Sequence, residues 1–305
     1  MRLSEDVDLE IIARGTPMFS GADLEATINE AALTAVMHDR DAVAMDDLEE
    51  ARDKVLWGRQ KRSRVMAEED RRATAYHEAG HALVASLLEH AEPLHKVTII
   101  PRGRALGATM QLPEQDRYTM SRNRLLANLT VLYGGRIAEE VFCGDISSGA
   151  QNDIKRATEL GHRMVCEWGM SEAVGPINFS DAEETLFLGR EVTKSKGHSE
   201  ETSLLIDQEI RKVLMECYKR AEILIKDHKP EMERLTQGLL EHEVLSRAQV
   251  DALIQGDNPP EPEAEDEPDS EPDVPAAAAE ETPPEAEAEE GPSDDDLESE
   301  GRFAY

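Results

Sequence analysis

The sequence has 305 residues, of which 39% are hydrophobic and 4% aromatic, and its formal net charge is -32. This acidic balance excludes nucleic acid as a partner, because phosphate binding requires clustered Lys and Arg. The three widely spaced cysteines argue against a disulfide framework, and the absence of a long apolar run argues against a membrane span or signal peptide. We therefore expect this chain to be soluble and cytoplasmic.

Residues 1–58 are predicted to form a small helical domain. A short apolar pattern covers residues 6–13, a stronger one follows Ser20 as far as residue 36, and a third covers 45–56. Ser20 is a suitable N-cap for the second helix. A plain helical bundle would show the same periodicity. Basic residues then form a predicted hinge at 59–64.

Residues 59–255 are predicted to form a second, mainly helical domain with a small β-sheet. Residues 68–89 carry an apolar stripe of helical period. Residues 97–100 and 106–112 are rich in β-forming types and flank a Pro-Arg-Gly turn, which predicts two short strands. Further helices are predicted over 120–142, 153–168, 198–227 and 230–242, with a short one after Ser246.

Residues 256–305 form an acidic tail rich in Pro, Glu and Ala. From residue 257 onward there are 20 acidic residues and one basic residue, and nine of the 15 prolines lie in the tail. Such a composition buries too little apolar surface to offset the entropy of ordering. We predict a disordered, solubilising spacer.

The residues with the clearest chemistry are at 77–81, which read His-Glu-Ala-Gly-His. Residues four apart share a helix face, so His77 and His81 can direct their imidazoles at one metal ion. Glu78 would then lie beside the open position of a zinc ion and take a proton from its bound water. Composition alone produces such a motif by accident in roughly a few per cent of chains like this one. The small residues inside the helical stripe reduce that chance, and the motif predicts zinc-dependent peptide hydrolysis.

A catalytic zinc needs a third protein ligand. No His or Glu follows the motif at metzincin spacing. Glu139 with Glu140 and, farther along, Asp153 are both suitable. Each has an ordinary explanation too, since Asp near a helix start satisfies free amides and a Glu pair often lies on a solvated face. The residues alone leave both alternatives open.

Five segments of the chain form a set of motifs in one order. They are AYHEAGH at 75–81, KVTIIPRGR at 96–104, LYGGRIAEE at 132–140, GAQNDIKRAT at 149–158 and WGMS at 168–171. Together they resemble the FtsH family of membrane-anchored, ATP-dependent zinc peptidases. The resemblance covers roughly residues 1–255, and several motifs in register are far more specific than HExxH alone.

The resemblance implies a role for each matching residue. His77, His81 and Asp153 would be the zinc ligands, which favours Asp153 over Glu139 and Glu140. Glu78 would be the general base of a zinc endopeptidase, in which zinc-bound water attacks the peptide carbonyl.

Supporting features are also implied by the resemblance. Asn152 and a turn at Gly134-Gly135 would support the site rather than take part in the chemistry. Residues 106–110 resemble the family's edge strand, onto which an extended substrate pairs through its backbone with little regard for sequence.

Residues 1–58 resemble the helical lid of an AAA ATPase, whose nucleotide-binding core is absent from this chain. The segment FSGADL at 19–24 resembles the part that approaches the nucleotide, so Gly21 and Ala22 are candidates for nucleotide proximity. Met18 stands where a glycine is usual. The sequence has no GxxxxGK[ST] loop, so we expect no ATPase activity from this chain alone. ATP and Mg²⁺ would be cofactors only of the complete protein.

The resemblance also implies a larger protein of which this chain is the C-terminal part. A missing N-terminal segment would carry the membrane helices and the ATP-binding core. The complete protein would be a homo-hexamer anchored in the cytoplasmic (inner) membrane and facing the cytosol. Its role would be protein quality control, with unfolded or short-lived membrane and cytosolic proteins as substrates.

Two other classes of function compete with this interpretation. A pseudo-peptidase scaffold would keep the fold without turnover, but the intact HEAGH motif and Asp153 argue against it. A binding module with a structural zinc would need four closed ligands. The sequence offers three and a general base.

Overall fold

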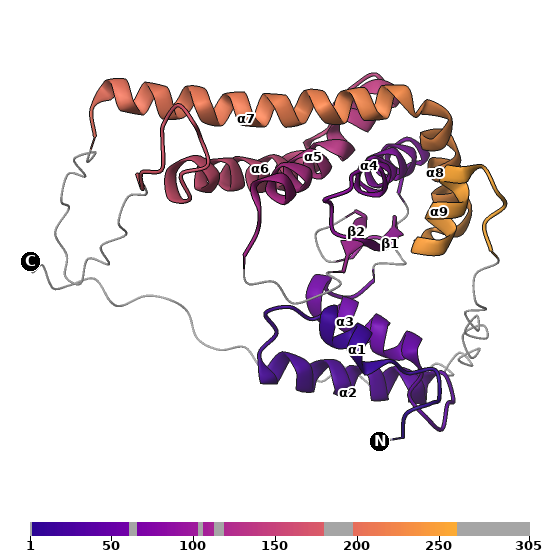
Figure 1. Ribbon diagram of the computed structural model, residues 1–305. Helices are drawn as coiled ribbons and strands as arrows, with labels where there is room; N and C mark the ends of the chain where they lie inside the picture. Colours follow the sequence, from indigo (N-terminus) through magenta and orange to yellow (C-terminus); the bar gives the residue numbers. More distant parts are fainter. Residues whose placement is uncertain (1, 61–65, 103–105, 113–118, 180–197, 261–305) are drawn as a thin grey trace, which may run out of the picture. The chain divides into compact units, whose positions relative to one another are not determined.

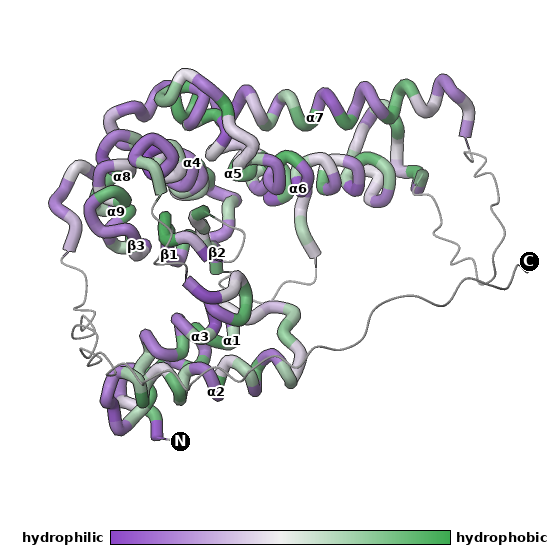
Figure 2. Tube along the Cα trace, turned by 180° about the vertical axis from the view of Figure 1, so that it is seen from behind, coloured by the Kyte–Doolittle hydropathy of each residue, from purple (hydrophilic) through white to green (hydrophobic). Residues whose placement is uncertain are grey.

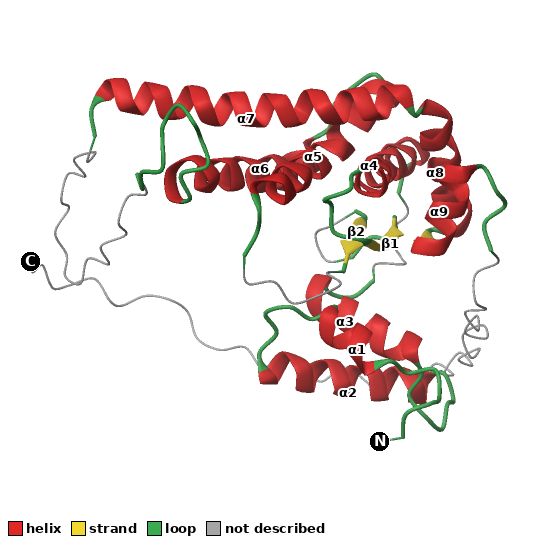
Figure 3. Ribbon diagram, viewed as in Figure 1, coloured by secondary structure: helices red, strands yellow, loops and turns green. Residues whose placement is uncertain are grey.

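The computed structural model describes residues 2–60, 66–102, 106–112, 119–179 and 198–260. The predicted hinge at 59–64 lies mostly outside the described residues, as does the predicted disordered tail at 256–305. Within the described residues the chain is mainly helical with one small sheet (Figure 3), which confirms the predicted fold class.

The N-terminal part contains three helices, α1 (Leu9–Arg14), α2 (Gly21–Met37) and α3 (Met45–Trp57) (Figure 1). Ser20 caps α2 as expected: its hydroxyl accepts from the Asp23 N–H at 3.3 Å, and the Asp23 carboxylate accepts from the Ser20 N–H at 2.8 Å. Met18 has φ 64° and is fully exposed. This left-handed conformation favours glycine, the residue that the family resemblance implies at this position.

Six helices make up most of the remaining residues that the structure describes, as predicted. They are α4 (Glu68–Leu87), α5 (Arg122–Ala138), α6 (Gln151–His162), α7 (Glu200–Asp227), α8 (Lys229–His242) and α9 (Arg247–Gln255). Two single π-helical turns extend α5 and α6, at Glu139–Cys143 and Arg163–Glu167, and a 3₁₀ turn at Ser148–Ala150 precedes α6. Such π turns are rare and often lie at functional sites.

The sheet has three strands in the order β2-β1-β3, all antiparallel. β1 (Leu94–Thr98) begins and ends earlier than the strand predicted at 97–100 and overlaps only its first two residues, whereas β2 (Ala108–Gln111) lies within the strand predicted at 106–112. β3 (Val244–Ser246) was not predicted, because three residues carry too little periodicity to reveal a strand. β2 lies at one edge of this sheet, next to α4.

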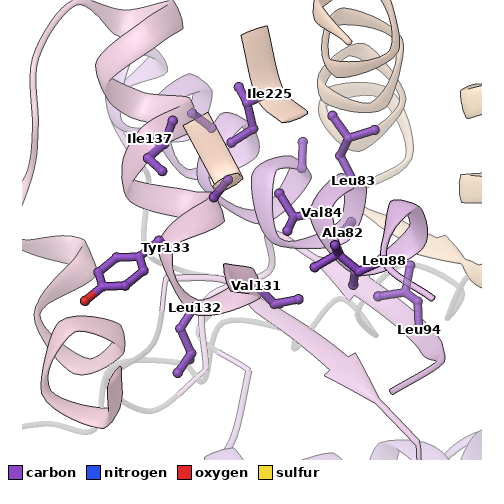
Figure 4. Packing of buried hydrophobic residues seen from close by; sticks show 14 of the residues in the cluster. Ala82, Leu83, Val84, Leu88, Leu94, Val131, Leu132, Tyr133, Ile137 and Ile225 are labelled. Atoms are coloured by element: carbon purple, nitrogen blue, oxygen red, sulfur yellow. The ribbon is translucent and has the colours of Figure 1, made fainter. Parts of the chain in front are cut away.

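The main core is formed where α4, α5, α7 and the sheet meet. Leu83 and Val84 of α4 and Ile225 of α7 are fully buried, and Ile137 of α5 is almost completely buried (Figure 4). Along α7, hydrophilic and hydrophobic residues alternate with the period of the helix (Figure 2). The hydrophobic residues therefore form a stripe that faces this core. No helix among the described residues is long and apolar enough to cross a membrane.

A cluster of ion pairs joins α3 to β1. The Glu49 carboxylate contacts His95 Nε2 at 2.9 Å and Lys96 Nζ at 3.1 Å, and Lys96 Nζ also contacts Asp53 Oδ2 at 2.6 Å. Burial alone would raise the pKa of Glu49. The hydrogen bond from His95 and the charges of Lys96 and Arg52 outweigh burial and hold the pKa of Glu49 well below its usual value.

Glu49→Gln is therefore expected to lower the free energy of unfolding by about 1–3 kcal/mol at pH 7, since it leaves buried charges without their partner. The pKa of Glu49 is lower in the folded state than in the unfolded state, so its contribution is complete above the ordinary glutamate pKa and is lost as pH falls toward the folded value. Urea unfolding of the parent and of Glu49→Gln, at pH 7 and below pH 4, measures the difference in their free energies of unfolding. Glu25→Gln, at an exposed position of α2, is the control. A difference that stays constant with pH would contradict the prediction.

Candidate metal centre

The histidine pair lies in the buried middle of α4. His77, Glu78 and His81 are each less than a tenth exposed. Their helix crosses α5 at glycines of both helices. A Cβ atom at Gly80 would lie 2.5 Å from the Gly134 carbonyl oxygen, and one at Gly134 would lie 2.6 Å from the Gly80 carbonyl oxygen. The two backbones therefore touch, which brings the motif directly against α5.

Gly80→Ala is expected to force α4 and α5 apart and to lower the free energy of unfolding by about 1–3 kcal/mol, as overpacking of a tight core does. The blocking atoms are the Gly134 backbone and the Cβ atom of Ala138, so no side-chain rotation can relieve the contact. Denaturant unfolding measures the loss. Gly21→Ala is the matched control, because a Cβ atom there meets nothing within 4 Å. Equal stability of the Gly80→Ala chain and the parent would show that the crossing can adjust.

The Nδ1 atoms of both histidines are held by hydrogen bonds. His77 Nδ1 lies 2.6 Å from Glu139 Oε1, and His81 Nδ1 lies 2.8 Å from the Val131 carbonyl oxygen. A Cβ atom at Gly135 would lie 2.6 Å from the His77 ring, so this glycine makes room for it. Because Nδ1 is engaged in each ring, Nε2 is the atom left for a ligand.

The Nε2 atoms converge on one carboxylate oxygen. They lie 3.0 Å from each other, and Asp153 Oδ2 lies 3.3 Å from His77 Nε2 and 3.5 Å from His81 Nε2. Donor atoms about 2.0–2.1 Å from a tetrahedral zinc ion are roughly 3.3–3.4 Å apart. The three donors therefore fit a zinc ion that they would share, and two nitrogens with one carboxylate oxygen are ligands that zinc accepts.

The contacts among these residues shift the pKa values of His77 and Asp153. Burial lowers the pKa of His77, but its hydrogen bonds to Asp153 and Glu139 outweigh burial and raise it to about 10. Burial raises the pKa of Asp153, and the two histidines outweigh that effect and hold it well below the usual value. A cation bound between the three donors would replace the imidazole proton, so metal affinity is expected to rise with pH.

The two other candidate carboxylates have different positions. Glu139 is buried and bridges two groups: its Oε1 contacts His77 Nδ1, and its Oε2 accepts a hydrogen bond from the Ser147 N–H at 2.9 Å. It thus ties the histidine to the segment that leads into α6 and Asp153. Glu140 is exposed and accepts from the Tyr218 hydroxyl at 2.7 Å. The turn expected at Gly134-Gly135 is absent: both lie within α5, where their missing side chains admit α4.

The Glu78 carboxylate points toward β2. The Thr109 hydroxyl donates to Glu78 Oε2 at 2.6 Å, and a Cβ atom at Gly107 would lie 2.7 Å from Glu78 Oε1. The Glu78 charge also contributes to the raised pKa of His77. The sequence did not predict the contacts that Thr109, Gly107 and the Val131 carbonyl make at the site. A backbone carbonyl has no sequence signal, and a lone Thr in a strand or a lone Gly just before one has a weak signal.

The expected nucleotide-proximal residues belong to another part of the chain. Gly21 and Ala22 form the first turn of α2, whereas the possible metal ligands come from α4 and α6. Nothing in the described residues places a nucleotide near them. Asn152 precedes Asp153 in the first turn of α6.

Two families match parts of the chain. Residues 64–253 match peptidase family M41, and residues 6–50 match the AAA+ lid domain. The first match includes both helices that carry the possible metal ligands.

The chain belongs to peptidase family M41.

Its relatives carry the name that the motifs suggested. The ATP-dependent zinc metalloprotease FtsH 2 of Methylacidiphilum infernorum is 52% identical over 254 residues, which are 83% of this chain and 40% of the relative. FtsH of Acidobacterium capsulatum is 50% identical over 85% of this chain and 40% of its own length, and FtsH of Thermotoga maritima is 49% identical over 83% and 42%. The resemblance to the FtsH family and the expectation of a metallopeptidase are confirmed. The chain spans about two fifths of the length of these relatives.

Proposed function

We propose that this chain is a zinc-dependent endopeptidase. The observation that carries the proposal is the convergence of His77 Nε2, His81 Nε2 and Asp153 Oδ2 at mutual distances of 3.0–3.5 Å. Family membership and the zinc metalloprotease names of the relatives support it. When bound, zinc supplies a Lewis acid for the scissile carbonyl and acidifies a water molecule.

The residues of the chain divide the remaining tasks. His77, His81 and Asp153 hold the cation, and Glu139 and the Val131 carbonyl fix the two imidazole rings through Nδ1. Glu78 is the general base, which accepts a proton from the attacking water and passes it to the leaving amine. The three ligands leave a fourth position for the reaction, as a catalytic rather than a structural zinc requires.

Substrate binding is assigned to β2, the edge strand beside Glu78. An extended polypeptide would pair with it through backbone hydrogen bonds, which places the peptide bond near the site with little demand on side chains. Unfolded chains meet this requirement, and folded proteins do not expose a free strand so readily. Unfolded or short-lived membrane and cytosolic proteins are the proposed substrates.

For the complete protein, the names of the relatives support ATP-dependent proteolysis. We propose that residues 1–58 act as the lid of an AAA module, that residues 59–255 form the peptidase domain, and that residues 256–305 are a disordered acidic spacer. Gly21 and Ala22 are proposed to lie near the nucleotide, with ATP and Mg²⁺ bound by a core outside this chain. A homo-hexamer anchored in the cytoplasmic membrane is the proposed assembly.

Cleavage of casein by the purified, zinc-loaded chain tests the proposed activity. Casein is loosely folded, so no ATP-driven unfolding step is needed. Cleavage that a zinc chelator abolishes and added zinc restores is the expected result. Absence of cleavage in both the chain and the complete protein, with one zinc ion bound per chain, would contradict the proposal.

A further inference from the structure

The Glu78 carboxylate is fixed by a residue that does not belong to the HEAGH motif. The Thr109 hydroxyl donates to Glu78 Oε2 at 2.6 Å, a short distance of the kind found when the acceptor carries a charge. The same hydroxyl lies 3.4 Å from the Glu78 carbonyl oxygen. Glu78 is only 6% exposed, so water does not readily replace this partner.

Gly107 borders the other side of the same carboxylate. A Cβ atom on Gly107 would lie 2.7 Å from Glu78 Oε1 and 2.8 Å from Cγ. The Thr109 hydroxyl therefore holds Oε2 of the carboxylate, and the missing side chain of Gly107 leaves room for Oε1. Thr109 lies in β2, and Gly107 directly precedes that strand.

We propose that Thr109 is a positioning residue, whose hydroxyl holds the Glu78 carboxylate in the orientation needed for proton transfer. The inference rests on the proposed function, in which Glu78 is the general base. A glutamate has three rotatable side-chain bonds, and a base must lie within hydrogen-bond reach of the proton that it takes. A carboxylate has about four acceptor sites on its two oxygens. One bond from Thr109 thus fixes the group and leaves capacity for the proton.

The position of Thr109 adds a link to substrate binding. Thr109 lies opposite Val97 in the β2–β1 ladder, and Val97 is fully buried in the core. β1 therefore anchors the position of Thr109 on one side of β2. A substrate that pairs along β2 would rest on the same strand that orients the base.

The test compares Thr109→Val, which keeps the shape and removes the donor, with Thr109→Ser, which keeps the hydroxyl. The assay uses the complete protein in which this chain occurs, with zinc and ATP, and casein as substrate. Thr109→Val is expected to lower kcat by about 10–100-fold, less than the roughly 10²–10⁴-fold that a general base contributes, because the base itself remains. KM should change by less than about twofold, and Thr109→Ser should restore most of kcat. Each variant should bind one zinc ion per chain.

Thr236→Val is the matched control. Thr236 is a buried threonine of α8 whose hydroxyl has no hydrogen-bond partner among the described residues, so the same substitution should leave kcat unchanged. Unchanged kcat in Thr109→Val would overturn the inference. So would an equal loss in Thr109→Ser, loss of zinc in Thr109→Val, or an effect confined to KM.

Glu78→Gln in the same assay separates this inference from the proposed function. Normal turnover of Glu78→Gln would remove the role of Glu78 as base, and with it any role for Thr109. An inactive Glu78→Gln beside a fully active Thr109→Val would overturn only the role of Thr109.

Discussion

Glu78→Gln is expected to abolish peptide hydrolysis and to leave one zinc ion bound per chain. Glutamine has nearly the same shape and can still contact Thr109, but its amide cannot accept a proton as a carboxylate does. Loss of a general base commonly costs about 10²–10⁴ in rate. Because Glu78 is not among the converging donors, the metal should remain. Casein cleavage and metal analysis of the purified chain measure the two quantities.

Glu140→Gln is the control for this prediction. Glu140 is an exposed glutamate bonded to Tyr218, so its replacement should leave both cleavage and zinc unchanged. A Glu78→Gln chain that still cleaves casein at the parent rate would remove Glu78 from the chemistry. Loss of zinc in Glu78→Gln would instead place its carboxylate among the ligands.

Asp153→Ala is expected to lose both zinc and turnover. Its Oδ2 lies within 3.5 Å of both Nε2 atoms, and without it only two histidine ligands remain. The loss of affinity should exceed the roughly 10–100-fold that removal of an outer hydrogen-bond partner causes. Titration with zinc against a competing chelator measures the affinity. Circular dichroism checks that the helices persist.

Glu139→Gln is the informative comparison. Glu139 contacts Nδ1 of His77 rather than Nε2, so its replacement should weaken zinc binding within the outer-partner range and leave the ion bound at saturating zinc. The opposite pattern, with zinc retained in Asp153→Ala and lost in Glu139→Gln, would move the third ligand to Glu139.

Local patterns account for the helices and for the histidine pair. The stripe over α4, the cap at Ser20 and the apolar periods of α5 to α8 depend on neighbours three or four residues away, and the sequence contains that information directly. The spacing of His77 and His81 is likewise a property of one helix. The short strand β3 was missed because its three residues are stabilised by pairing with β1, about 150 residues earlier in the chain.

The position of the third donor could not be derived from the residues. Glu139 and Asp153 are both acidic residues near helix ends, and by chemistry either could ligate zinc. The family resemblance favoured Asp153, and the fold provides a physical reason for the difference. It places Asp153 beside the Nε2 atoms of both histidines, whereas Glu139 contacts the opposite nitrogen, Nδ1, of His77.

The sequence by itself determined the helical class, the HEAGH pair and the expectation of zinc peptidase chemistry, because each depends on residues within one or two helical turns. Only the tertiary structure decided which carboxylate meets the histidines, which glycines admit the α4–α5 crossing and which hydroxyl holds Glu78. Those contacts join residues 31 to 76 positions apart, from Glu78 with Thr109 to His77 with Asp153. Their formation depends on how the elements pack, and no local pattern records that packing.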